Sequence, residues 1–535
     1  MTNFKHVYLA VVTMVVLAMG PAQAQTYLDI HDFTEADGCC QLNPGLLAQG
    51  LDGNIYGATQ NGGKFGLGVI FMMTPTGQYT DIHDMASTEG YYPQSGLSLG
   101  WDGFFYGTTY LGGSGKVGTV FKVSPEGALT VLYNFMNGTD GAYPRTPPVQ
   151  APDGNLYGAT ANSTVATLYK LTPAGAFSVV LNLPSQSYSP LIVGTDGNLY
   201  GTTVYGGAFN SGCIFQFAPT KKKNNFKIIY SFHTEGYSPF GPLMQGADGF
   251  LYGTASVGGT SSVGVVFKVS TAGKYTVLYN FSSTNPTNGS TPLAGVVQGS
   301  DGYLYGVTTT GGVNGQGVLF KVSTKGKGFA VLHNFATATG DSPLSTPMLH
   351  TNGMIYGLTE HGGSHTAYGA MYSLDAGLKP FVSPFVFFSG KVGSFGGILG
   401  QGFSNATGVK FGAGVGTFVS SADTFMTATV DTGATTGVIT VEEPGGNLST
   451  PLVFDVIPAI VSYSPKSGAV GTKVTITGTS LLQTSSVTIG KVKAVFTVNS
   501  DTQVTATVGA DAVTGTVTLK TPGGMATGAG KFTVN

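Results

Sequence analysis

A tyrosine-glycine pair returns seven times along this chain at a near-constant interval. It begins at Tyr56-Gly57, and its other tyrosines are Tyr106, Tyr157, Tyr200, Tyr252, Tyr305 and Tyr356. Five of the six intervals are close to fifty residues, and only the one after Tyr157 is clearly shorter. Self-similarity at such a period, in a chain rich in strand-forming residues, indicates one supersecondary unit copied around an axis. The fold therefore has to be inferred from the repeat before any single residue.

Each copy contains four strand segments separated by turn signals. An Asp-Gly or Asn-Gly pair, at Asp52 in the first copy and Asn352 in the last, follows a short apolar stretch and precedes the strand with the tyrosine. Such pairs favour the positive φ angles of a two-residue type I′ turn, so we expect a tight hairpin there. A Gly-Gly loop lies six residues after each tyrosine, except in the shortened third copy. Turns at this spacing between β-branched and aromatic runs predict an antiparallel, all-β protein.

Four strands in each of seven copies predict a seven-bladed β-propeller over residues 25–380. Residues 26–33 carry the pattern of a fourth strand, similar to residues 80–85, whereas the seventh copy ends near Leu378 without that pattern. We therefore expect the N-terminal strand to complete the last blade by pairing with residues 369–374.

The repeat resembles a known family. Residues 301–308 read DGYLYGVT, and they are followed by Gly311-Gly312, by VLFKV at 318–322 and by VLHNF at 331–335. This string is similar to the Gloeo/Verruco (GloVer) tandem repeat of exported bacterial proteins, and the resemblance covers about residues 26–380. That family is defined by its repeat, so the resemblance implies a fold and export but brings no activity with it.

A second repeat starts after Pro380. Val392-Gly393 and Pro444-Gly445-Gly446 recur at one constant offset, as Val470-Gly471 and Pro522-Gly523-Gly524. This offset predicts two tandem modules, and their Val, Thr and Ile strands between Gly and Pro turns fit Ig-like β-sandwich modules. Residues 464–478 resemble the opening of the IPT/TIG immunoglobulin-like fold. We therefore assign residues 458–535 to an IPT/TIG module and residues 381–457 to a degenerate IPT/TIG-like module, for which the resemblance implies a spacer or binding role.

The first residues predict a secretory signal peptide over residues 1–24. Lys5 precedes a mostly apolar run from Val7 to Met19, and Ala22-Gln23-Ala24 has the small-x-small pattern of a signal peptidase site, so we expect cleavage after Ala24. The run is too short to span a bilayer comfortably, and no later stretch reaches eighteen apolar residues. We expect a protein that is secreted or held in the cell envelope, with no membrane segment after the signal is removed.

Composition restricts the partners. Only 9% of the residues are charged and the formal net charge is -2, so the chain lacks the electrostatic footprint that nucleic acid or anionic lipid requires. The expected partners are carbohydrate or extracellular protein, with no nucleic acid. Three cysteines are an odd count, which argues against a disulfide framework. We expect Cys213 to be a buried hydrophobe in a strand, and the adjacent Cys39 and Cys40 to be either free thiols or a strained, labile pair.

Propeller topology sorts the connections onto two faces. The first-to-second and third-to-fourth strand turns share one face, which we call the turn face. The Gly-Gly loops and the links between blades share the other, which we call the loop face. Binding residues usually lie on loops held by a rigid scaffold, so the loop face is the candidate binding surface. Its tyrosines suit sugar stacking or protein contact, with packing between blades as the alternative. They are Tyr91, Tyr92, Tyr110, Tyr143, Tyr188, Tyr205 and Tyr237.

The seventh copy has Glu360 and His361 before its Gly-Gly loop, where the other copies have neutral residues. His365 follows that loop, and His350 lies earlier in the same copy. Carboxylate and imidazole groups serve as general acids, general bases or metal ligands, so these four are the candidate catalytic residues. Drift within the repeat is the alternative, because no helix aligns the two loop histidines as zinc ligands. We expect neither a metal site nor a cofactor.

Other polar residues recur with the repeat. His31, His83 and His333 occupy the place of tyrosines in the fourth strand, so we expect them to pack between outer strands. Four glutamines lie on the innermost strand, three residues before the turn, where they either line the central channel or satisfy backbone groups. They are Gln49, Gln150, Gln245 and Gln298.

These patterns favour an exported binding or cell-surface interaction protein that recognises carbohydrate or protein through its loop face. The alternative is a carbohydrate-active propeller enzyme, such as a lyase, a hydrolase or a kelch-like oxidase. The sequence contains no Cys-x-x-Cys zinc pair and no phosphate-binding Gly-rich lysine loop. Propeller active sites gather residues from several blades, however, so these absences leave the question of an enzyme open.

Overall fold

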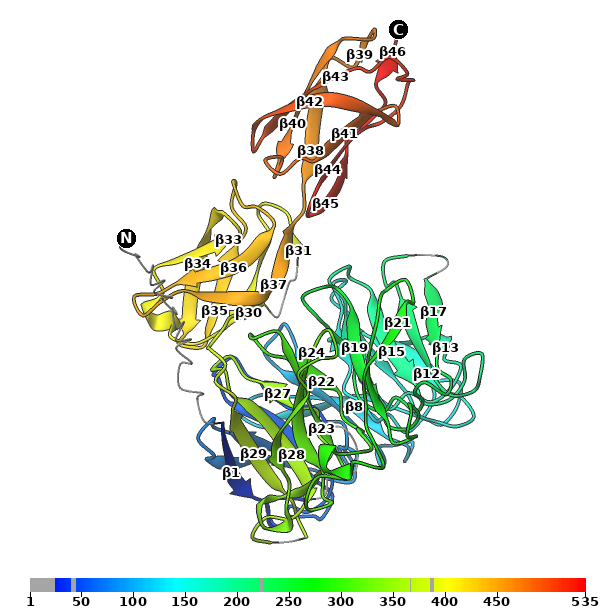
Figure 1. Cartoon of the computed structure of the whole chain (residues 1–535), viewed down its shortest axis with the longest axis vertical. Coiled ribbons are helices and arrows are strands. Elements are labelled where there is room, and N and C mark those ends of the chain that lie inside the picture. The colour runs from blue at the N-terminus through cyan, green and yellow to red at the C-terminus, as the bar shows by residue number, and fades with distance from the viewer. Residues whose placement is uncertain (1–24, 40–44, 222, 224, 366, 385–388) are drawn as a thin grey trace, which may run out of the picture.

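A computed structural model describes residues 25–39, 45–221, 223, 225–365, 367–384 and 389–535. The expected signal peptide and Cys40 lie outside the described residues. Seven antiparallel sheets form a seven-bladed β-propeller, and three further sheets, of eight, seven and two strands, follow it towards the C-terminus (Figure 1). Within the described residues the only helices are three 3-10 turns, η1 (Pro286–Asn288), η2 (Thr337–Thr339) and η3 (Phe403–Asn405). None of these is long and apolar enough to cross a membrane.

Each blade contributes a very short first strand on the inside and a longer fourth strand on the outside. Blades 1 to 3 consist of β2 (Ala48–Gln49), β3 (Ile55–Thr59), β4 (Val69–Met73) and β5 (Tyr79–Asp84); β6 (Ser98–Leu99), β7 (Phe105–Thr109), β8 (Thr119–Val123) and β9 (Leu129–Asn134); and β10 (Val149–Gln150), β11 (Leu156–Ala159), β12 (Thr167–Leu171) and β13 (Phe177–Asn182). Blades 4 to 6 consist of β14 (Ile192–Val193), β15 (Leu199–Thr203), β16 (Cys213–Phe217) and β17 (Phe226–Ser231); β18 (Met244–Gln245), β19 (Leu251–Ala255), β20 (Val265–Val269) and β21 (Tyr275–Asn280); and β22 (Val296–Gln298), β23 (Tyr303–Thr308), β24 (Val318–Ser323) and β25 (Ala330–Asn334). Blade 7 consists of β27 (Met348–Leu349), β28 (Ile355–His361), β29 (Ala370–Asp375) and β1 (Thr26–Asp32), with β26 (Asp341–Pro343) also paired to β28.

The recurring tyrosine joins the blade core to the turn face. In blade 1 the ring of Tyr56 is 2% exposed, and its hydroxyl donates a hydrogen bond of 2.9 Å to the carboxylate of Asp52. Blades 2 to 6 repeat this bond at 2.7 to 2.8 Å. In blade 7 the Asn352 amide donates to the Tyr356 hydroxyl instead, and that hydroxyl donates to the Pro75 carbonyl of blade 1. The tyrosine and the turn residue four positions before it therefore work as a pair.

The glycine after that tyrosine leaves room for an aromatic ring. Gly57 lies opposite Phe71 on the neighbouring strand, and a Cβ at Gly57 would meet the Phe71 ring at 2.5 Å. The same holds in blade 3, where a Cβ at Gly158 would meet the Tyr169 hydroxyl at 2.2 Å. The large third-strand side chain occupies the space that a second-strand side chain would take, which explains why the pair is tyrosine-glycine.

The predicted type I′ turns were wrong in type. In the Asp52-Gly53 pair of blade 1, Gly53 has a positive φ of 78° and Asp52 does not. The Gly53 amide donates to the Gly50 carbonyl at 3.1 Å and the Gly50 amide donates to the Asn54 carbonyl at 2.8 Å. This is a three-residue loop in which a type I turn is followed by a left-handed glycine. Asp52 keeps a negative φ and uses its carboxylate to bind the Asn54 amide and the Tyr56 hydroxyl.

The N-terminal strand closes the ring. β1 pairs with β29 from Thr26 opposite Asp375 to Asp32 opposite Ala370, and Figure 1 shows β1 in dark blue beside the yellow-green β29. This is the pairing that the fourth-strand pattern of residues 26–33 predicts. A second closure lies at the inner end of the blades, where the Gln49 side chain accepts a hydrogen bond from the Thr351 amide at 3.0 Å.

Stacked rings join neighbouring blades on the outside. His333 of blade 6 stacks on Tyr27 of blade 7 with a centroid distance of 3.5 Å, and His31 of blade 7 stacks on Tyr79 of blade 1 at 4.7 Å. Tyr133 and Phe177 make the equivalent contact between blades 2 and 3. Burial lowers the pKa of His333 to about 4, which keeps the imidazole neutral for this role. The predicted packing role is confirmed for His31 and His333, whereas His83 contacts the Gly127 carbonyl of blade 2 at 3.1 Å and the Glu89 carboxylate at 3.0 Å.

The C-terminal strands keep the constant offset seen in the sequence. The first sheet contains β30 (Ser383–Pro384), β31 (Ser389–Gly390), β32 (Phe395–Leu399), β33 (Gly408–Phe411), β34 (Gly414–Ala422), β35 (Phe425–Thr429), β36 (Gly437–Glu442) and β37 (Leu448–Val456). The following strands are β38 (Ala459–Ser464), β39 (Ser467–Gly468), β40 (Lys473–Thr479), β41 (Ser486–Ile489), β42 (Val492–Ser500), β43 (Gln503–Thr507), β44 (Val517–Thr521), β45 (Gly524–Thr527) and β46 (Thr533–Val534). The bounds of β33, β34 and β35 reappear at that same offset as the bounds of β41, β42 and β43. Each half also has a hydrophobic core of its own.

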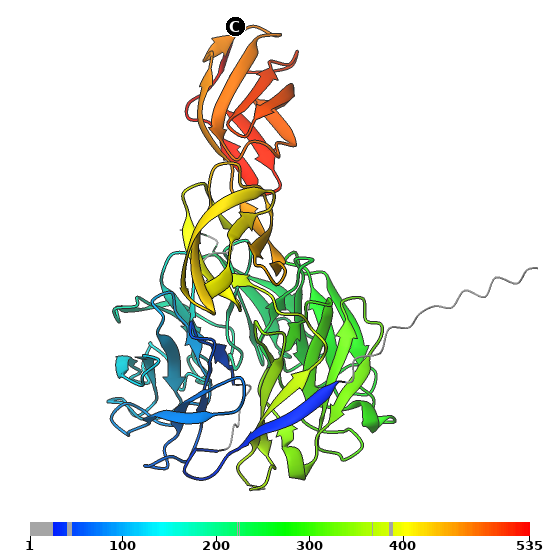
Figure 2. The same cartoon turned by 90° about the vertical axis from the view of Figure 1, so that its left-hand side faces the viewer.

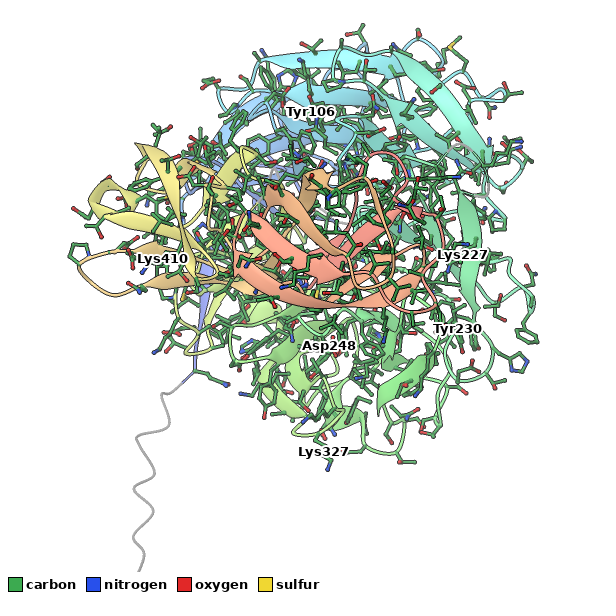
Figure 3. All side chains as sticks on the ribbon, turned by 90° about the horizontal axis from the view of Figure 1, so that it is seen from above. Tyr106, Lys227, Tyr230, Asp248, Lys327 and Lys410 are labelled. Atoms are coloured by element: carbon green, nitrogen blue, oxygen red, sulfur yellow. The ribbon has the colours of Figure 1, made fainter. Side chains whose placement is uncertain are left out.

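The C-terminal strands stand on the turn face of the propeller, as Figures 2 and 3 show from the side and from above. The Thr424 hydroxyl donates to the Leu51 carbonyl at 2.6 Å, next to the turn of blade 1. At the turn of blade 7, the Thr351 hydroxyl donates to the Gly400 carbonyl at 3.1 Å and accepts from the Gln401 amide at 2.8 Å. The turn face is therefore partly covered, and these contacts leave the loop face on the far side.

Candidate functional site

The links between blades and the Gly-Gly loops lie side by side, as the predicted loop face requires. Tyr91 in the link before blade 2 forms a β-bridge with Leu111 in the loop of that blade, and Tyr237 bridges Val257 in the same way in blade 5. Ser290 and Thr310 repeat the bridge in blade 6. The loop face is thus a layer of short backbone pairings that hold their side chains in place.

Arg145 lies between two tyrosine rings on this face. Its guanidinium carbon is 4.4 Å from the ring centre of Tyr110 and 4.9 Å from that of Tyr188. Tyr143 packs against Tyr110 with 5.2 Å between ring centres. All four side chains are half-buried. Such cation–π contacts contribute about 0.5 to 1 kcal/mol each at exposed sites, and the two rings hold the guanidinium in one place.

Two more residues complete this group, which we call the Arg145 cluster: Arg145, Tyr110, Tyr143, Tyr188, Phe240 and Gln94. Phe240 stacks on Tyr188 with a centroid distance of 5.6 Å and nearly parallel planes. Gln94 accepts a hydrogen bond of 3.3 Å from Arg145. Tyr110 comes from the blade 2 loop and Tyr188 from the link after blade 3, so the cluster straddles blade 3, whose own loop is the shortened copy.

Sequence reasoning missed Arg145, Phe240 and Gln94. Arg145 is the single arginine of the 535 residues, and that count was the signal that would have singled it out. Phe240 takes no part in the tyrosine pattern, and it belongs to the cluster only because its ring stacks on Tyr188 in the folded chain. Gln94 is buried, and its role depends on Arg145.

Four of the candidate tyrosines lie outside this cluster: Tyr91, Tyr92, Tyr205 and Tyr237. The ring of Tyr91 packs over Gly112, where an added Cβ would lie 2.7 Å from it, and it meets Tyr92 edge to face. Tyr237 packs against the core between blades 4 and 5. Tyr205 is 51% exposed, in the blade 4 loop. The prediction of a tyrosine-rich face therefore divides into one compact group and several single side chains.

Backbone strain fixes two of the tyrosines. Tyr92 and Tyr143 have φ angles of 60° and 56°, and each precedes a proline. Ser238, Thr291 and Ser342 have the same left-handed φ before a proline in other links. A non-glycine residue with this φ is uncommon and costs free energy. Because the strain recurs around the ring, it belongs to the architecture of the links, and it sets the direction in which Tyr143 leaves the backbone.

Glu360 and His361 end the second strand of blade 7 on the loop face. His361 Nε2 lies 3.7 Å from Glu360 Oε1, and His361 pairs through its backbone with the buried Asp341. Burial raises the pKa of Glu360, the charge of His361 opposes this, and the charge of Asp341 adds to it. A carboxyl with a raised pKa has the property that a general acid needs.

His365 belongs to a different group in the same blade. Its Nδ1 is 3.1 Å from the Ser364 hydroxyl, and Asp32 of the closing strand is near both residues. Asp32 takes the place that Asn134 and Asn334 have in other blades, where the side chain accepts a hydrogen bond from the loop backbone. Within the described residues, the contacts of Glu360, His361 and His365 come from blade 7 and the link into it.

His350 does not join these residues. It lies before the turn of blade 7, at the opposite end of β28 from His361, and is 1% exposed. Its Nδ1 accepts a hydrogen bond from the Asn352 amide at 3.1 Å, so its Nε2–H donates to the Gly53 carbonyl of blade 1 at 2.9 Å. Burial lowers the pKa of His350. The contacts describe a neutral imidazole that joins two blades.

The glutamines of the first strand join neighbouring blades. Gln150 accepts from the Trp101 amide at 2.8 Å, Gln245 from the Thr195 amide at 2.7 Å and Gln298 from the Ala247 amide at 3.0 Å. Each acceptor lies one blade after its donor, and Gln49 with Thr351 extends the series across the closure. Both alternatives left open by the sequence hold, because these side chains satisfy backbone groups, and Gln49, Gln245 and Gln298 also line a cavity in the central channel.

Cys213 is a buried free thiol in β16, 3.1 Å from the Thr203 hydroxyl, and burial raises its pKa. Cys39 is disulfide-bonded.

Among the described residues no three His, Cys, Asp or Glu side chains are arranged to hold a metal ion.

Two family models match the sequence. The Gloeobacter/Verrucomicrobia repeat matches residues 15–190 and 186–417, and the IPT/TIG domain matches residues 458–534. No curated protein matches the chain.

Several solved structures resemble the chain weakly. A fungal alcohol oxidase of the AA5 family in complex with copper is 13% identical, with 93% of this chain and 98% of that chain covered and a TM-score of 0.43. A putative 6-phosphogluconolactonase from Bacteroides uniformis is 16% identical, with coverage of 57% and 89% and a TM-score of 0.41. A surface glycan-binding protein from Prevotella bryantii is 16% identical at a TM-score of 0.23; the match covers 28% of this chain and only 41% of that protein. Similarities at these scores assign no function to this chain.

Proposed function

The chain belongs to the Gloeobacter/Verrucomicrobia repeat family and ends in an IPT/TIG domain, and from this premise we propose that it is an exported binding protein whose loop face recognises carbohydrate or an extracellular protein. The signal pattern of residues 1–24, with cleavage after Ala24, supports export. The constant offset between the C-terminal strands supports two Ig-like modules, residues 381–457 and 458–535, that act as a stalk.

The Arg145 cluster is the observation that carries this proposal. Sugar rings present apolar C–H faces that stack on tyrosine and phenylalanine, and a guanidinium donates to hydroxyl or carboxylate oxygens beside them. The rings are held by their own contacts before any ligand arrives, so little side-chain entropy is lost on binding. Carbohydrate is therefore the ligand class that this cluster favours. A protein surface is the second ligand class that the proposal includes.

The position of the C-terminal strands supports the same proposal. They cover the turn face through Leu51, Thr351 and their partners, on the side away from the Arg145 cluster. A propeller held by its turn face would present its loop face outwards. This arrangement fits a protein whose C-terminal part serves as a spacer and whose propeller makes the contact.

A glycan array tests the proposal, with the mature chain from residue 25 as probe. We expect binding to a restricted set of glycans, and we expect Tyr188→Ala and Arg145→Ala to weaken it at least tenfold. Tyr205→Ala is the matched control, because Tyr205 is an exposed loop-face tyrosine outside the cluster. The glycan binding of this variant should differ less than twofold from that of the wild type. Two results together would contradict the proposal. The array would show no bound glycan, and the cluster variants would bind extracellular protein as strongly as the wild type does.

A carbohydrate-active enzyme is the second candidate. The observation that favours it is the raised pKa of Glu360 on the loop face, near Asp341. Release of reducing sugar from a glycan that binds the array, lost in Glu360→Gln, would establish this candidate in place of simple binding.

A further inference from the structure

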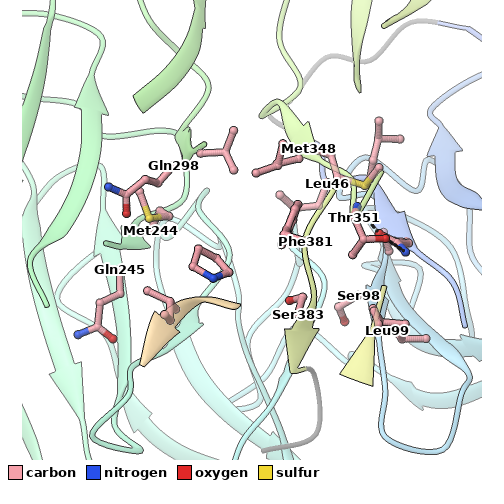
Figure 4. A pocket seen from close by; sticks show the side chains of 18 of the residues that line it. Leu46, Ser98, Leu99, Met244, Gln245, Gln298, Met348, Thr351, Phe381 and Ser383 are labelled. Carbon is pink, nitrogen blue, oxygen red and sulfur yellow. Dashed lines mark hydrogen bonds between the residues drawn. The ribbon is translucent and has the colours of Figure 1, made fainter. Parts of the chain in front are cut away.

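A cavity of about 510 Å³ lies in the central channel, where the C-terminal strands cover it (Figure 4). Its walls are the first strands β2, β6, β18, β22 and β27 and adjoining residues of blades 1, 2, 5, 6 and 7. Phe381, Ser383, Leu399, Pro451 and Leu452 close it from the C-terminal side. The volume falls within the range of about 300 to 1,000 Å³ that is usual for small-molecule sites.

The wall of this cavity carries no charge. Its lining contains no Asp, Glu, Lys, Arg or His among the described residues. An ionised ligand group taken out of water into such a wall would have no partner, which costs several kcal/mol or more. The chemistry of the lining therefore excludes a buried charged group.

Most polar side chains of the lining are already engaged with the protein. Gln245 binds the Thr195 amide and the Gly249 carbonyl, and Gln298 binds the Ala247 amide and the Gly302 carbonyl. In Figure 4 the amide ends of Gln245 and Gln298 point away from Met348 and Phe381. On the other side, the Ser98 hydroxyl donates to the Pro148 carbonyl. The blade-joining bonds thus consume the groups that would otherwise bind a sugar or a water cluster.

What remains facing the cavity is mostly aliphatic, with the Phe381 ring and the Ser383 hydroxyl on the C-terminal side. Leu46, Leu99, Met244, Val297, Met348 and Leu349 line it and are half-buried. Methionine side chains are flexible and polarisable, so Met244 and Met348 can adapt to an irregular apolar shape. Water in this space would find few hydrogen-bond partners, and its replacement by an apolar molecule is favourable.

We infer that the cavity is a binding site for a neutral apolar small molecule with an aliphatic chain. This site is separate from the loop face, because it lies at the inner strands and under the C-terminal strands. The bound molecule would touch both the propeller and Phe381, Leu399 and Leu452, so its binding would also strengthen the junction between the two parts of the chain.

The test uses N-phenyl-1-naphthylamine, a neutral fluorophore whose emission rises in apolar surroundings, with the whole mature chain. We expect saturable binding at one site and displacement by 1-dodecanol. Val297→Phe should fill part of the cavity and weaken binding at least tenfold. Leu99→Phe fills it from blade 2 and serves as a second variant if Val297→Phe does not fold.

Val149→Phe is the matched control. Val149 occupies the same first-strand position in blade 3 that Val297 has in blade 6, is also half-buried, and does not line the cavity. Its fluorophore affinity should stay within twofold of the wild type. No saturable binding to the wild type, unchanged binding in both cavity variants, or an equal loss in Val149→Phe would each overturn the inference.

Discussion

Single side chains in this molecule divide into those that repeat with the blades and those that occur once. The tyrosine, the turn carboxylate and the glycine of each copy serve the blade itself, as the bonds from Tyr56 to Asp52 and the space above Gly57 show. Arg145 and Glu360 have no counterpart in the other copies. A repeat explains the first kind completely, and a function has to be sought in the second.

Glu360, His361 and His365 remain a hypothesis at this scale, and their replacement by the Thr, Val and Ser types of sister copies tests it. If they form a reactive or binding site, the triple variant should lose turnover or ligand binding by at least tenfold while keeping its melting temperature within a few degrees. The measurement is the glycan binding and sugar release described above. Unchanged binding and turnover would reduce the three residues to variation within the repeat.

Asp29 gives the propeller a pH-dependent stability. Burial, a hydrogen bond to Asp32 and the charge of Asp32 raise the pKa of Asp29 from 3.8 to about 7. Between about pH 4 and pH 7 the folded protein therefore holds a proton that the unfolded chain has released, so stability falls as pH rises through this window. We expect a higher melting temperature at pH 5 than at pH 7.5, and a smaller difference in Asp29→Asn.

Calorimetry across that pH range measures the effect. Asp375→Asn, on the strand paired with β1, is the matched control and should keep the pH dependence of the wild type. Equal pH dependence in the wild type and Asp29→Asn would show that Asp29 does not carry the effect.

At the scale of strands, the blade was predictable and its connections to other blades were not. The period of about fifty residues, the four strand segments and the fourth-strand pattern of residues 26–33 are all local signals, and they led to the correct ring and its closure. The turn type was missed because Asp-Gly occurs in both two-residue and three-residue hairpins. The glutamine bonds between blades and the contacts of Arg145 join residues about 35 to 50 positions apart, and no local pattern records them.

Closure by β1 predicts a large effect from a short deletion. Removal of residues 26–36 should lower the melting temperature of the whole propeller and promote association, because β29 would become an unpaired edge. Differential scanning calorimetry and size-exclusion chromatography measure the two effects. A deleted chain that melts like the wild type and stays monomeric would contradict a closing role for β1.

Point variants on the same strand refine this prediction. Tyr27→Ala removes the stack on His333 and the bond from the Tyr27 hydroxyl to the Thr339 carbonyl, so it should lower the free energy of unfolding by about 3 to 5 kcal/mol. Leu28, the next residue, is 51% exposed, and Leu28→Ala should stay within about 0.5 kcal/mol of the wild type.

At the scale of the whole molecule, the propeller and the C-terminal strands meet through few but specific contacts on the turn face. Thr351 has a central place, because its hydroxyl binds Gly400 and Gln401 of the C-terminal strands and Gln49 of blade 1. The sequence predicted the propeller and the C-terminal strands but not the contact between them. Neither the propeller period nor the constant offset in the C-terminal sequence indicates which surfaces touch. The cavity in the channel forms where the propeller and the C-terminal strands touch, so it could not be predicted from the sequence either.

Thr351→Val is the variant that tests the junction. It keeps the shape of the side chain and removes the hydroxyl, so we expect the C-terminal strands to move more freely against the propeller and the radius of gyration in small-angle scattering to rise. Thr195→Val is the matched control, because Thr195 occupies the same position before the turn of blade 4. An unchanged radius of gyration in Thr351→Val would mean that the other contacts hold the junction alone.

The pairing of β1 with β29 also sets the order of events during synthesis. Thr26 and its partner Asp375 are 349 positions apart (375 − 26). At about 5 to 20 residues per second, the first strand emerges roughly 17 to 70 s before the strand that it needs. Until then every partial chain is an open arc with an unpaired edge at each end. Ring closure therefore works as a test of completeness: a chain truncated anywhere before β29 never closes its ring, and it stays open to the chaperones and proteases that remove unfinished proteins.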